Sequence, residues 1–416
     1  MRTLSKLLIT RYEGRVLTAR IQNGKVIQMD LEPSEASGRL GNIYIGKVKN
    51  IVKNINAAFV DLGGGQMGYY SLSDNESHLF TQPGRTGALR EGDEILVQVS
   101  RDAVKTKAPV LTSNLNFPGR YSVLTVGKTA AGVSAKIKDA GERQRLKEIA
   151  GRWSGDSCGA ILRTNAAGVP EEVLEEELSL LKKRMEQTLK EGTMRTCYSC
   201  LCREMPSYIN GVRDARPEEL EEILTDDGDI FEELTRYLEE SRPEELPKLV
   251  LYDDPLLPLQ KLYSLETAIS HALARKVWLK SGAYLVIEPT EALAVIDVNS
   301  GKYAGRKKLD DTILKINLEA AEEIGRQLRL RNLSGIIIID FIDMERAEDR
   351  ECLMDSLRKI VSADPVKTTV VEMTKLNLVE LTRKKVRRPF YEQMNEAKGL
   401  FSHTEAFSQF FGGHFI

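Results

Sequence analysis

One stretch, residues 284–343, constrains the fold of this chain more than any other. It begins with YLVIEPTEALAVIDVNSGKY and ends with SGIIIIDFIDM. Residues 284–288 predict a strand, a short turn follows at PTE, and residues 292–299 alternate between apolar and polar side chains as a second strand. In that second strand Asp297 and Asn299 lie on one face, because side chains two apart point the same way.

A helix and a third strand follow in the same stretch. Asp310 and Asp311 are N-cap candidates for a helix that extends to Arg331. Its apolar face recurs at helical spacing, at Ile313, Ile316, Ala320, Ile324 and Leu328. Residues 335–339 form a short, wholly apolar run, as expected of a strand buried on both faces. Strand, crossover helix and strand together predict one right-handed parallel unit.

Two carboxylates end the two predicted parallel strands. Asp297 lies near the end of one strand and Asp340 ends the other. If the strands are neighbours, about 5 Å apart, both carboxylates share a crevice beyond the sheet, where open sheets bind ligands. Close carboxylates repel unless a proton or cation lies between them, and ligands made only of oxygen favour Mg²⁺ or Mn²⁺. Asn299 adds a neutral group that can orient a phosphate or a water. Spacing alone gives equal weight to the alternative, in which both aspartates only cap strands.

Longer blocks in this region resemble a known family. ALAVIDVNSGKY, NLEAAEEIGRQLRLRNLSGIIIIDFIDM and LTRKKVR are similar to the catalytic region of the ribonuclease E/G family. The resemblance extends from the first residues to about Pro389. It implies an endoribonuclease that hydrolyses single-stranded RNA to 5′-phosphate and 3′-hydroxyl ends in RNA processing or decay, with a preference for 5′-monophosphorylated RNA. Asp297 and Asp340 would hold Mg²⁺ or Mn²⁺, and Asn299 would assist.

The resemblance also implies the fold class, an α+β multidomain chain. An RNase H-like subdomain would accept two insertions and precede a DNase I-like α/β catalytic subdomain. The predicted boundaries are 1–37 and 212–274 for the two parts of the RNase H-like subdomain, 38–113 for an S1-type OB barrel, 114–211 for a 5′-sensor subdomain, 275–390 for the catalytic subdomain and 391–416 for a C-terminal tail.

Short strands dominate the first hundred residues. Residues 1–37 predict three strands joined by hairpin turns at Glu13-Gly14 and Asn23-Gly24. Residues 38–113 contain short strands separated by glycine turns, and they resemble an S1-type barrel of the OB class.

The barrel carries candidate RNA contacts. OB barrels bind single strands by stacking bases on exposed aromatic rings beside a basic groove. Phe59 and Tyr69 fall on the family's RNA-contacting aromatic positions, and Lys107 falls on its basic position. The alternative places Phe59 in the barrel core, where a single strand phenylalanine usually belongs.

A candidate phosphate site follows in AILRTNAAG. Arg163 and Thr164 end a predicted strand and enter a glycine-containing loop, and a guanidinium, a hydroxyl and free loop N–H groups can hold a phosphate. By resemblance this is the family's 5′ sensor, with Gly119 and Val123 at pocket-lining positions. Lys367 stands where the family usually has a second arginine, and a lysine offers a point charge in place of a planar fork.

Residues 259–280 predict one helix that leads into the catalytic region. Its apolar face would contain Leu262, Leu265, Ile269, Leu273 and Val277.

Composition sets broad limits. A chain of 416 residues with 42% hydrophobic content can build several cores. The net charge of −2 hides segregation, because residues 218–240 are acidic while residues 383–388 are basic. A nearly neutral total therefore does not exclude a nucleic-acid partner. The four histidines are in no paired arrangement, which disfavours a metal-free nuclease that uses two histidines as acid and base.

Location and assembly are predicted from absences. The N-terminus does not resemble a signal peptide, no apolar run approaches membrane-spanning length, and five cysteines without a framework pattern suit a reducing compartment. We therefore expect a cytoplasmic protein without a membrane partner. Cys197, Cys200 and Cys202 lack a second Cys or His pair and are interpreted as core or strand residues. The segment after Pro389 contains no cysteine, so zinc is not expected and a homo-oligomer would lack the family's zinc link.

Two rival functions differ in class from the first. One is a non-catalytic RNA-binding regulator that retains the barrel and the 5′ sensor, and the intact set of Asp297, Asn299 and Asp340 argues against it. The other is a metal-dependent DNase, which the RNA-type barrel disfavours.

Overall fold

In a computed structural model, the chain forms two compact units, Met1–Pro33 with Pro217–Ile416, and Ser34–Arg216. The structure describes residues 4–33, 40–75, 77–101, 108–155, 157–216, 218–290, 292–301 and 309–399. Helices and strands are mixed throughout, as predicted, and the described strands form four sheets. None of the described helices is long and apolar enough to cross a membrane.

The N-terminal strands belong to a sheet that a distant segment completes. Its strands are β1 (Ser5–Tyr12), β2 (Arg15–Gln22), β3 (Lys25–Leu31), β14 (Leu220–Thr225) and β15 (Leu249–Leu251), in the order β15-β14-β1-β2-β3. Both predicted hairpin turns are present, with positive φ at Glu13-Gly14 and at Asn23-Gly24, as type I′ turns require. The parallel pairing of β1 with β14 joins segments about 200 residues apart, although the exact subdomain boundaries stay a prediction.

Helices cover this sheet, and one of them comes from the end of the described chain. The helices of this part are α4 (Gly228–Ser241), α5 (Leu259–Leu262), α6 (Leu265–Leu273) and α9 (Phe390–Ala397). Phe390 and Met394 of α9 are fully buried in the core beside the N-terminal strands. Gln393 Oε1 accepts a hydrogen bond from the Leu31 N–H at 2.8 Å. Ordered packing therefore continues beyond residue 390, where we expected a tail. Residues 401–416, with the tail phenylalanines, lie outside the described residues.

The prediction of one helix over residues 259–280 is wrong. The helix breaks between α5 and α6, where Ser264 adopts a left-handed conformation with φ of 50°. After α6 the chain forms β16 (Lys276–Trp278), which pairs with the next strand. The spacing of Leu273 and Val277 fits a helix, but ladder hydrogen bonds and burial of Val277 against the next sheet decide the local structure.

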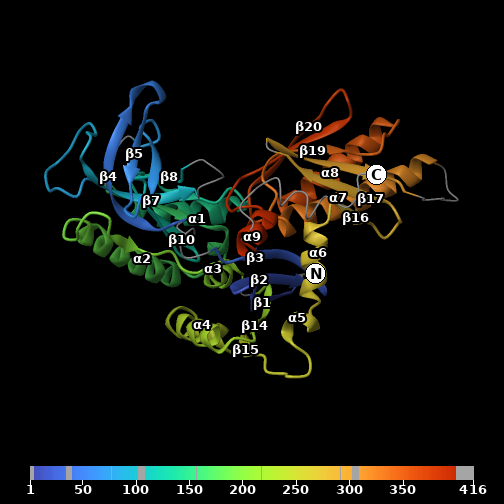
Figure 1. The fold of residues 1–416 in the computed structure, drawn as a ribbon, viewed down its shortest axis with the longest axis horizontal. Helices are drawn as coiled ribbons and strands as arrows, with labels where there is room; N and C mark the ends of the chain where they lie inside the picture. Colours follow the sequence, from blue (N-terminus) through green and yellow to red (C-terminus); the bar gives the residue numbers. More distant parts are fainter. Residues whose placement is uncertain are drawn as a thin grey trace. The chain divides into compact units, whose positions relative to one another are not determined.

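A closed barrel forms the first part of the second unit (Figure 1). Its strands are β4 (Ile43–Val52), β5 (Ala57–Asp61), β6 (Met67–Ser71), β7 (Glu94–Arg101) and β8 (Val110–Thr112). They pair in the order β4-β5-β6-β8-β7, and β7 returns to β4. The β6–β8 pair is parallel and the other pairs are antiparallel. A closed five-stranded barrel of this kind is consistent with the OB-like fold that the sequence predicted.

The rest of this unit is a small sheet with three helices. The strands are β9 (Asn116–Pro118), β10 (Ser122–Val126), β11 (Gly132–Val133) and β12 (Cys158–Leu162), and the helices are α1 (Ala140–Trp153), α2 (Glu171–Gly192) and α3 (Ser207–Asp214). Helix α2 buries Leu174, Leu178, Leu181 and Met185, whose spacing of three or four residues places them on one stripe. A further short strand, β13 (Cys200–Cys202), pairs with β4.

The 284–343 stretch forms the centre of a six-stranded sheet. The remaining strands are β17 (Tyr284–Pro289), β18 (Leu293–Asn299), β19 (Gly335–Asp340), β20 (Thr368–Met373) and β21 (Leu378–Arg383), in the order β16-β17-β18-β19-β21-β20. Strands β18 and β19 are parallel and are connected through α7 (Leu309–Leu330), as predicted. Because α7 begins at Leu309, Asp310 and Asp311 lie in its first turn and neither is its N-cap.

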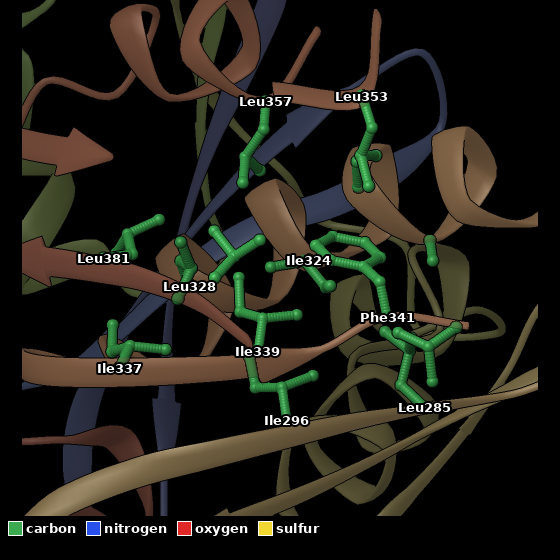
Figure 2. Close-up of a cluster of buried hydrophobic side chains, with 14 of the residues drawn as sticks. Leu285, Ile296, Ile324, Leu328, Ile337, Ile339, Phe341, Leu353, Leu357 and Leu381 are labelled. Atoms are coloured by element: carbon green, nitrogen blue, oxygen red, sulfur yellow. The ribbon is translucent and has the colours of Figure 1, made fainter. Parts of the chain in front are cut away.

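Both long helices of this part pack on the same face of the sheet. Figure 2 shows side chains of α7, such as Ile324 and Leu328, gathered with Ile337 and Ile339 of β19 and with Leu357 of α8 (Ala347–Ser362). The opposite face carries no helix among the described residues of the core. The prediction that β19 is buried on both faces is therefore wrong, since Ile337 and Ile339 are fully buried but Ile336 is 51% exposed.

Candidate active site

Asp297 and Asp340 lie directly opposite each other across the parallel β18–β19 ladder. Their side chains point to the open face, because the alternating residues Ile296, Val298 and Ile339 are buried against the helices. The prediction that the two strands are neighbours is confirmed. The pair lies on the open face of the sheet, near the carboxyl ends of both strands.

Among the residues that the structure describes, the pair has a neutral partner and no cationic one. Asn299 Nδ2 donates a hydrogen bond to Asp297 Oδ2 at 2.6 Å, which fixes the orientation of that carboxylate. Partial burial raises the pKa of Asp340, and the negative charges of Asp297 and Asp343 raise it further. Neither Asp297 nor Asp340 forms an ion pair within the described part of the chain. This surplus of negative charge favours binding of a cation.

Asp343 is a nearby carboxylate to which the sequence pattern assigned no role. It follows Asp340 by three residues in the loop after β19, and its Oδ1 accepts a hydrogen bond from Asn377 Nδ2 at 3.0 Å. Asn377 lies in the turn between β20 and β21 with φ of 61°, so its backbone position suits asparagine. The second aspartate of DFIDM was the available signal, but its partner is 34 residues away.

The donor set fits a hard divalent cation. Two carboxylates and an amide provide oxygen ligands, which Mg²⁺ and Mn²⁺ prefer. Within the described ranges no group of three or more His, Cys, Asp or Glu side chains could hold a metal ion. The protein would therefore contribute one or two carboxylates and leave other coordination positions to water and substrate, as is usual for Mg²⁺ sites that act on phosphates.

The barrel presents two aromatic rings outside its core. Phe59 and Tyr69 are paired across β5 and β6, with ring centroids 6.2 Å apart and an interplanar angle of 76°. Their neighbours Ala58 and Tyr70 are buried in the barrel core, whereas Phe59 and Tyr69 are only half-buried and face outward. The alternative that placed Phe59 in the core is therefore wrong. Lys107 lies outside the described residues.

Arg163 follows the last residue of β12 and is held from two sides. Its Nη1 donates to the Gly119 carbonyl oxygen at 2.6 Å and to Asp214 Oδ1 at 2.8 Å. No bond from its Nε or Nη2 is found among the described residues, so this edge of the guanidinium stays available to a ligand. The hydroxyl of Thr164 shares a hydrogen bond of 2.8 Å with Ser134 Oγ.

Asp214 is a second residue that sequence inspection missed. Its Oδ1 also accepts from Arg213 Nε at 3.0 Å, and Arg213 pairs with Glu204 at 3.2 Å. Burial alone would raise the pKa of the Asp214 carboxyl, but Arg213 and Arg163 outweigh that effect and hold the pKa below its ordinary value. The dipeptide Arg213-Asp214 gave no signal by itself, because its contact with Arg163 spans 51 positions.

The Gly119 turn is fixed by a carboxylate from α2. Glu177 accepts backbone hydrogen bonds from Arg120, Tyr121 and Ser122, at 2.7, 3.0 and 2.8 Å. A Cβ at Gly119 would lie 2.6 Å from the Glu177 carboxyl carbon, so a side chain here would push that carboxylate away from the backbone N–H groups it holds. The Gly119 carbonyl is thus positioned to hold Arg163.

The remaining sensor candidates lie in different places. Val123 is in β10, opposite Ile161 of β12. Lys367 belongs to the other unit, where it is exposed just before β20, and its carbonyl accepts from the Lys384 N–H at 2.9 Å.

The three clustered cysteines lie at the edge of the barrel. Cys200 and Cys202 are in β13, and Arg184 Nη2 donates to Cys202 Sγ at 3.0 Å. Burial raises the pKa of both Cys197 and Cys200, which disfavours their thiolate forms.

An open sheet face with paired carboxylates, in a chain that also has an OB-like barrel with outward aromatic rings, is typical of a metal-dependent enzyme that acts on single-stranded nucleic acid. The sequence profile of the Ribonuclease E/G family matches residues 116–386. Ribonuclease G of Salmonella typhimurium (strain SL1344) is 37% identical over 397 residues, which are 92% of this chain and 80% of that protein. Ribonuclease G of Escherichia coli (strain K12) has the same identity and coverage.

A ribonuclease E shows a similar relationship. That of Nostoc sp. (strain PCC 7120) is 35% identical over 374 residues, 88% of this chain and 54% of that protein. The chain belongs to the ribonuclease E/G family. It is an endoribonuclease, and therefore a hydrolase, of a nuclease class that generally uses a divalent metal.

Proposed function

We propose that this endoribonuclease hydrolyses single-stranded RNA with Mg²⁺, or Mn²⁺ in its place, held by Asp297 and Asp340. The products would be a 5′-phosphate and a 3′-hydroxyl, and RNA with a 5′-monophosphate would be preferred. The observation that carries the proposal is the pairing of these two aspartates on an open sheet face without a cationic partner in the described chain.

The chain's own residues have separable tasks. When bound, the cation would polarise the scissile phosphate and lower the pKa of a bound water. Asp297 and Asp340 hold it, and Asn299 fixes the Asp297 carboxylate through the 2.6 Å hydrogen bond. In the hydrolysis, the water oxygen bonds to phosphorus and the bond from phosphorus to O3′ breaks. The water gives up a proton and the leaving O3′ gains one.

Two further regions would bind the substrate. The outward rings of Phe59 and Tyr69 suit stacking with unpaired bases, and Lys107 would add a positive charge nearby. In the 5′ sensor, the free edge of Arg163 suits bidentate contact with a phosphate. Gly119, Val123 and Thr164 would complete this sensor, and Lys367 is proposed as a second phosphate-binding cation.

The finer descriptions of fold and context belong to the same proposal. We assign the sheet β15-β14-β1-β2-β3 to an RNase H-like subdomain with a structural role, and the sheet containing β18 and β19 to a DNase I-like catalytic subdomain. We further propose action in the cytoplasm, in ribosomal RNA processing and messenger RNA decay, without a zinc link between subunits.

The test is cleavage of a single-stranded oligonucleotide that carries either a 5′-monophosphate or a 5′-hydroxyl, with and without Mg²⁺. We expect Mg²⁺-dependent internal cleavage, faster for the monophosphate, with 3′-hydroxyl ends on the upstream fragments. An Asp297→Asn/Asp340→Asn protein prepared identically controls for a contaminating nuclease. Tight RNA binding without any turnover in the wild type would contradict the proposal and favour the non-catalytic regulator.

A further inference from the structure

An exposed aromatic pair lies on the same sheet face as the aspartate pair. Trp278 is 64% exposed, and its ring centroid is 5.2 Å from that of Tyr284, at an interplanar angle of 59°. The ammonium of Lys276 lies 4.1 Å from the Trp278 centroid and 3.4 Å from the Tyr284 centroid. These three residues come from β16 and β17, at the edge of the catalytic sheet.

Strand register places this group on the face that carries Asp297 and Asp340. One row across the sheet consists of Trp278, Tyr284 and Asn299, which are paired in sequence. The next row consists of Lys276, Val286, Asp297 and Asp340. Paired residues point to the same side, and the alternating residues Val277, Leu285 and Ile287 are buried against the helices. Trp278 is thus two strands from Asn299, or about 10 Å across the sheet.

Protection of the sheet edge does not explain the group. An edge strand is commonly blunted by a lysine, which Lys276 provides. A large exposed indole has the opposite effect, because it adds apolar surface to the edge. The lysine charge has no carboxylate partner among the described residues, since its contacts are the two rings. The arrangement therefore offers an apolar ring face and a cation side by side, which suits a nucleobase and its phosphate.

We propose that Trp278, Tyr284 and Lys276 form a stacking platform for a base of the RNA substrate close to the scissile phosphate. A base would stack on the exposed Trp278 ring, Tyr284 would hold that ring from the side, and Lys276 would attract the adjacent phosphate. The inference rests on the proposed catalytic role of Asp297 and Asp340, because these residues define where the scissile phosphate lies. Removal of the base that stacks on the platform would therefore slow cleavage, whereas removal of a base at another position would not.

The first test is an abasic scan of the substrate. A series of oligonucleotides with one known cleavage site, each lacking a single base at a successive position around that site, is cleaved by wild type and by Trp278→Ala. We expect Trp278→Ala to lower kcat/KM about 10-fold on the intact RNA. At one position near the site, base removal should slow the wild type by a similar factor and leave Trp278→Ala unchanged.

Conservative and control variants separate stacking from folding. Trp278→Phe should restore most of the rate and the sensitivity at the same position, since it keeps a ring. Leu256→Ala removes another exposed apolar side chain of the same unit and should change neither. Lys276→Ala should reduce the salt dependence of RNA affinity by about one phosphate contact. If the fold-losses in kcat/KM from Trp278→Ala and from base removal simply multiply at every position, then Trp278 and the bases act independently. That result would show that the platform does not exist.

The second test measures RNA binding at Trp278 by fluorescence, in a variant that does not cleave RNA. The chain has two tryptophans, so Trp153→Phe leaves Trp278 as the sole indole. In that variant, combined with Asp297→Asn, RNA binding should quench Trp278 fluorescence, and RNA lacking the mapped base should not. If RNA binds and the Trp278 fluorescence is not quenched, the platform proposal is overturned.

If the Asp297→Asn protein still cleaves RNA, the proposed catalytic pair is wrong, whatever the fluorescence shows. If Trp278→Ala instead dissociates a dimer in sedimentation and the abasic scan finds no special position, the surface belongs to a second copy and the inference is overturned.

Discussion

The aspartate pair on the β18–β19 ladder and the arginine that follows β12 differ in how their charges are compensated. Asp297 and Asp340 face each other with an amide as the identified partner, and burial together with the negative charges of Asp297 and Asp343 raises the pKa of Asp340. Arg163 is instead held by a carboxylate and a carbonyl, and the carboxylate of Asp214 has a second arginine behind it.

This difference indicates what each region binds. Two carboxylates without a cationic partner among the described residues leave an electrostatic cost that a divalent cation would remove. An arginine whose charge is compensated needs no ligand, because one edge of its guanidinium is already hydrogen-bonded. The other edge would be the one that binds a phosphate in the proposed sensor. The first region should therefore depend absolutely on its ligand, whereas the second should only adjust a rate.

The largest effect should come from the aspartate pair. We expect Asp297→Asn or Asp340→Asn to lower Mg²⁺-dependent kcat by more than the ~10–100-fold that follows loss of an outer partner of a metal ligand. RNA affinity should stay within about threefold, because the barrel contacts remain. Cleavage kinetics at several Mg²⁺ concentrations measure this. Asp355→Asn, an exposed carboxylate of α8, is the matched control. Near-normal turnover by either variant would remove the basis of the comparison.

A smaller effect should come from the cations of the sensor. We expect Arg163→Ala and Lys367→Ala each to reduce the preference for 5′-monophosphorylated over 5′-hydroxyl RNA by about 1–3 kcal/mol, the range for hydrogen bonds to charged groups. The loss should shrink as salt rises. Matched oligonucleotides give kcat/KM for both ends. Arg152→Ala, an exposed arginine of the unit that contains Arg163, should have no such effect. Equal wild-type rates for both ends would show that the sensor does not function here.

The aromatic rings of the barrel should respond to substitution without this salt dependence. Phe59→Ala and Tyr69→Ala should each weaken RNA binding by about 1–3 kcal/mol, since stacking on a ring is lost. Titration with fluorescent RNA at two salt concentrations tests this, and Leu180→Ala, an exposed side chain on α2, provides the control. A loss confined to low salt would indicate that these positions act through charge after all.

A still smaller effect should come from Asp214→Asn. The amide keeps a hydrogen bond to Arg163 but removes the compensating charge, so the 5′-monophosphate preference should fall by about 1 kcal/mol. The cleavage rate of 5′-hydroxyl RNA should not change.

The stability of the protein should also depend on Asp214, because folding lowers the pKa of its carboxyl. The ionised carboxylate stabilises the folded protein at pH values above the unfolded-state pKa of about 4, and this stability is lost as the pH falls through the folded-state pKa. Thermal melts of Asp214→Asn should therefore lose less stability on acidification than those of wild type.

We expect zinc chelation to have no effect on assembly. Because burial raises the pKa of Cys197 and Cys200 and so disfavours the thiolate forms that bind zinc, the oligomeric state should not respond to a strong zinc chelator in sedimentation. A shift from dimer to monomer would identify a bound metal, and Cys197, Cys200 and Cys202 would be the first residues to replace by serine.

Several features were predicted correctly from sequence because their signals are local. These features are the hairpin turns at Glu13-Gly14 and Asn23-Gly24, the alternation in β18 and the apolar stripe of α7. Each of them follows from contacts within about 20 residues. The motifs of 284–343 also predicted that Asp297 and Asp340 lie on neighbouring strands, which their pairing confirms. The catalytic roles of Asp297, Asn299 and Asp340 stay a prediction. These elements have one dominant period, so local propensity and burial agree.

Errors occurred where local pattern and long-range packing disagreed. Residues 259–280 have helical spacing, yet β16 forms because β17 supplies ladder partners. The apolar run of β19 suggested burial on two faces, but α7 and α8 both occupy one face and leave Ile336 exposed.

The sequence by itself determined which residues can carry the chemistry, because motif identity and strand alternation are properties of neighbouring positions. The tertiary structure alone decided what surrounds them: Asp214 beside Arg163, Glu177 under the Gly119 turn, Asn377 beside Asp343 and Trp278 in the row of Asn299. The first three contacts join residues between 34 and 57 positions apart, and the fourth depends on the register of three strands. Such partners are set by how whole elements pack and pair, which no local period in the chain records.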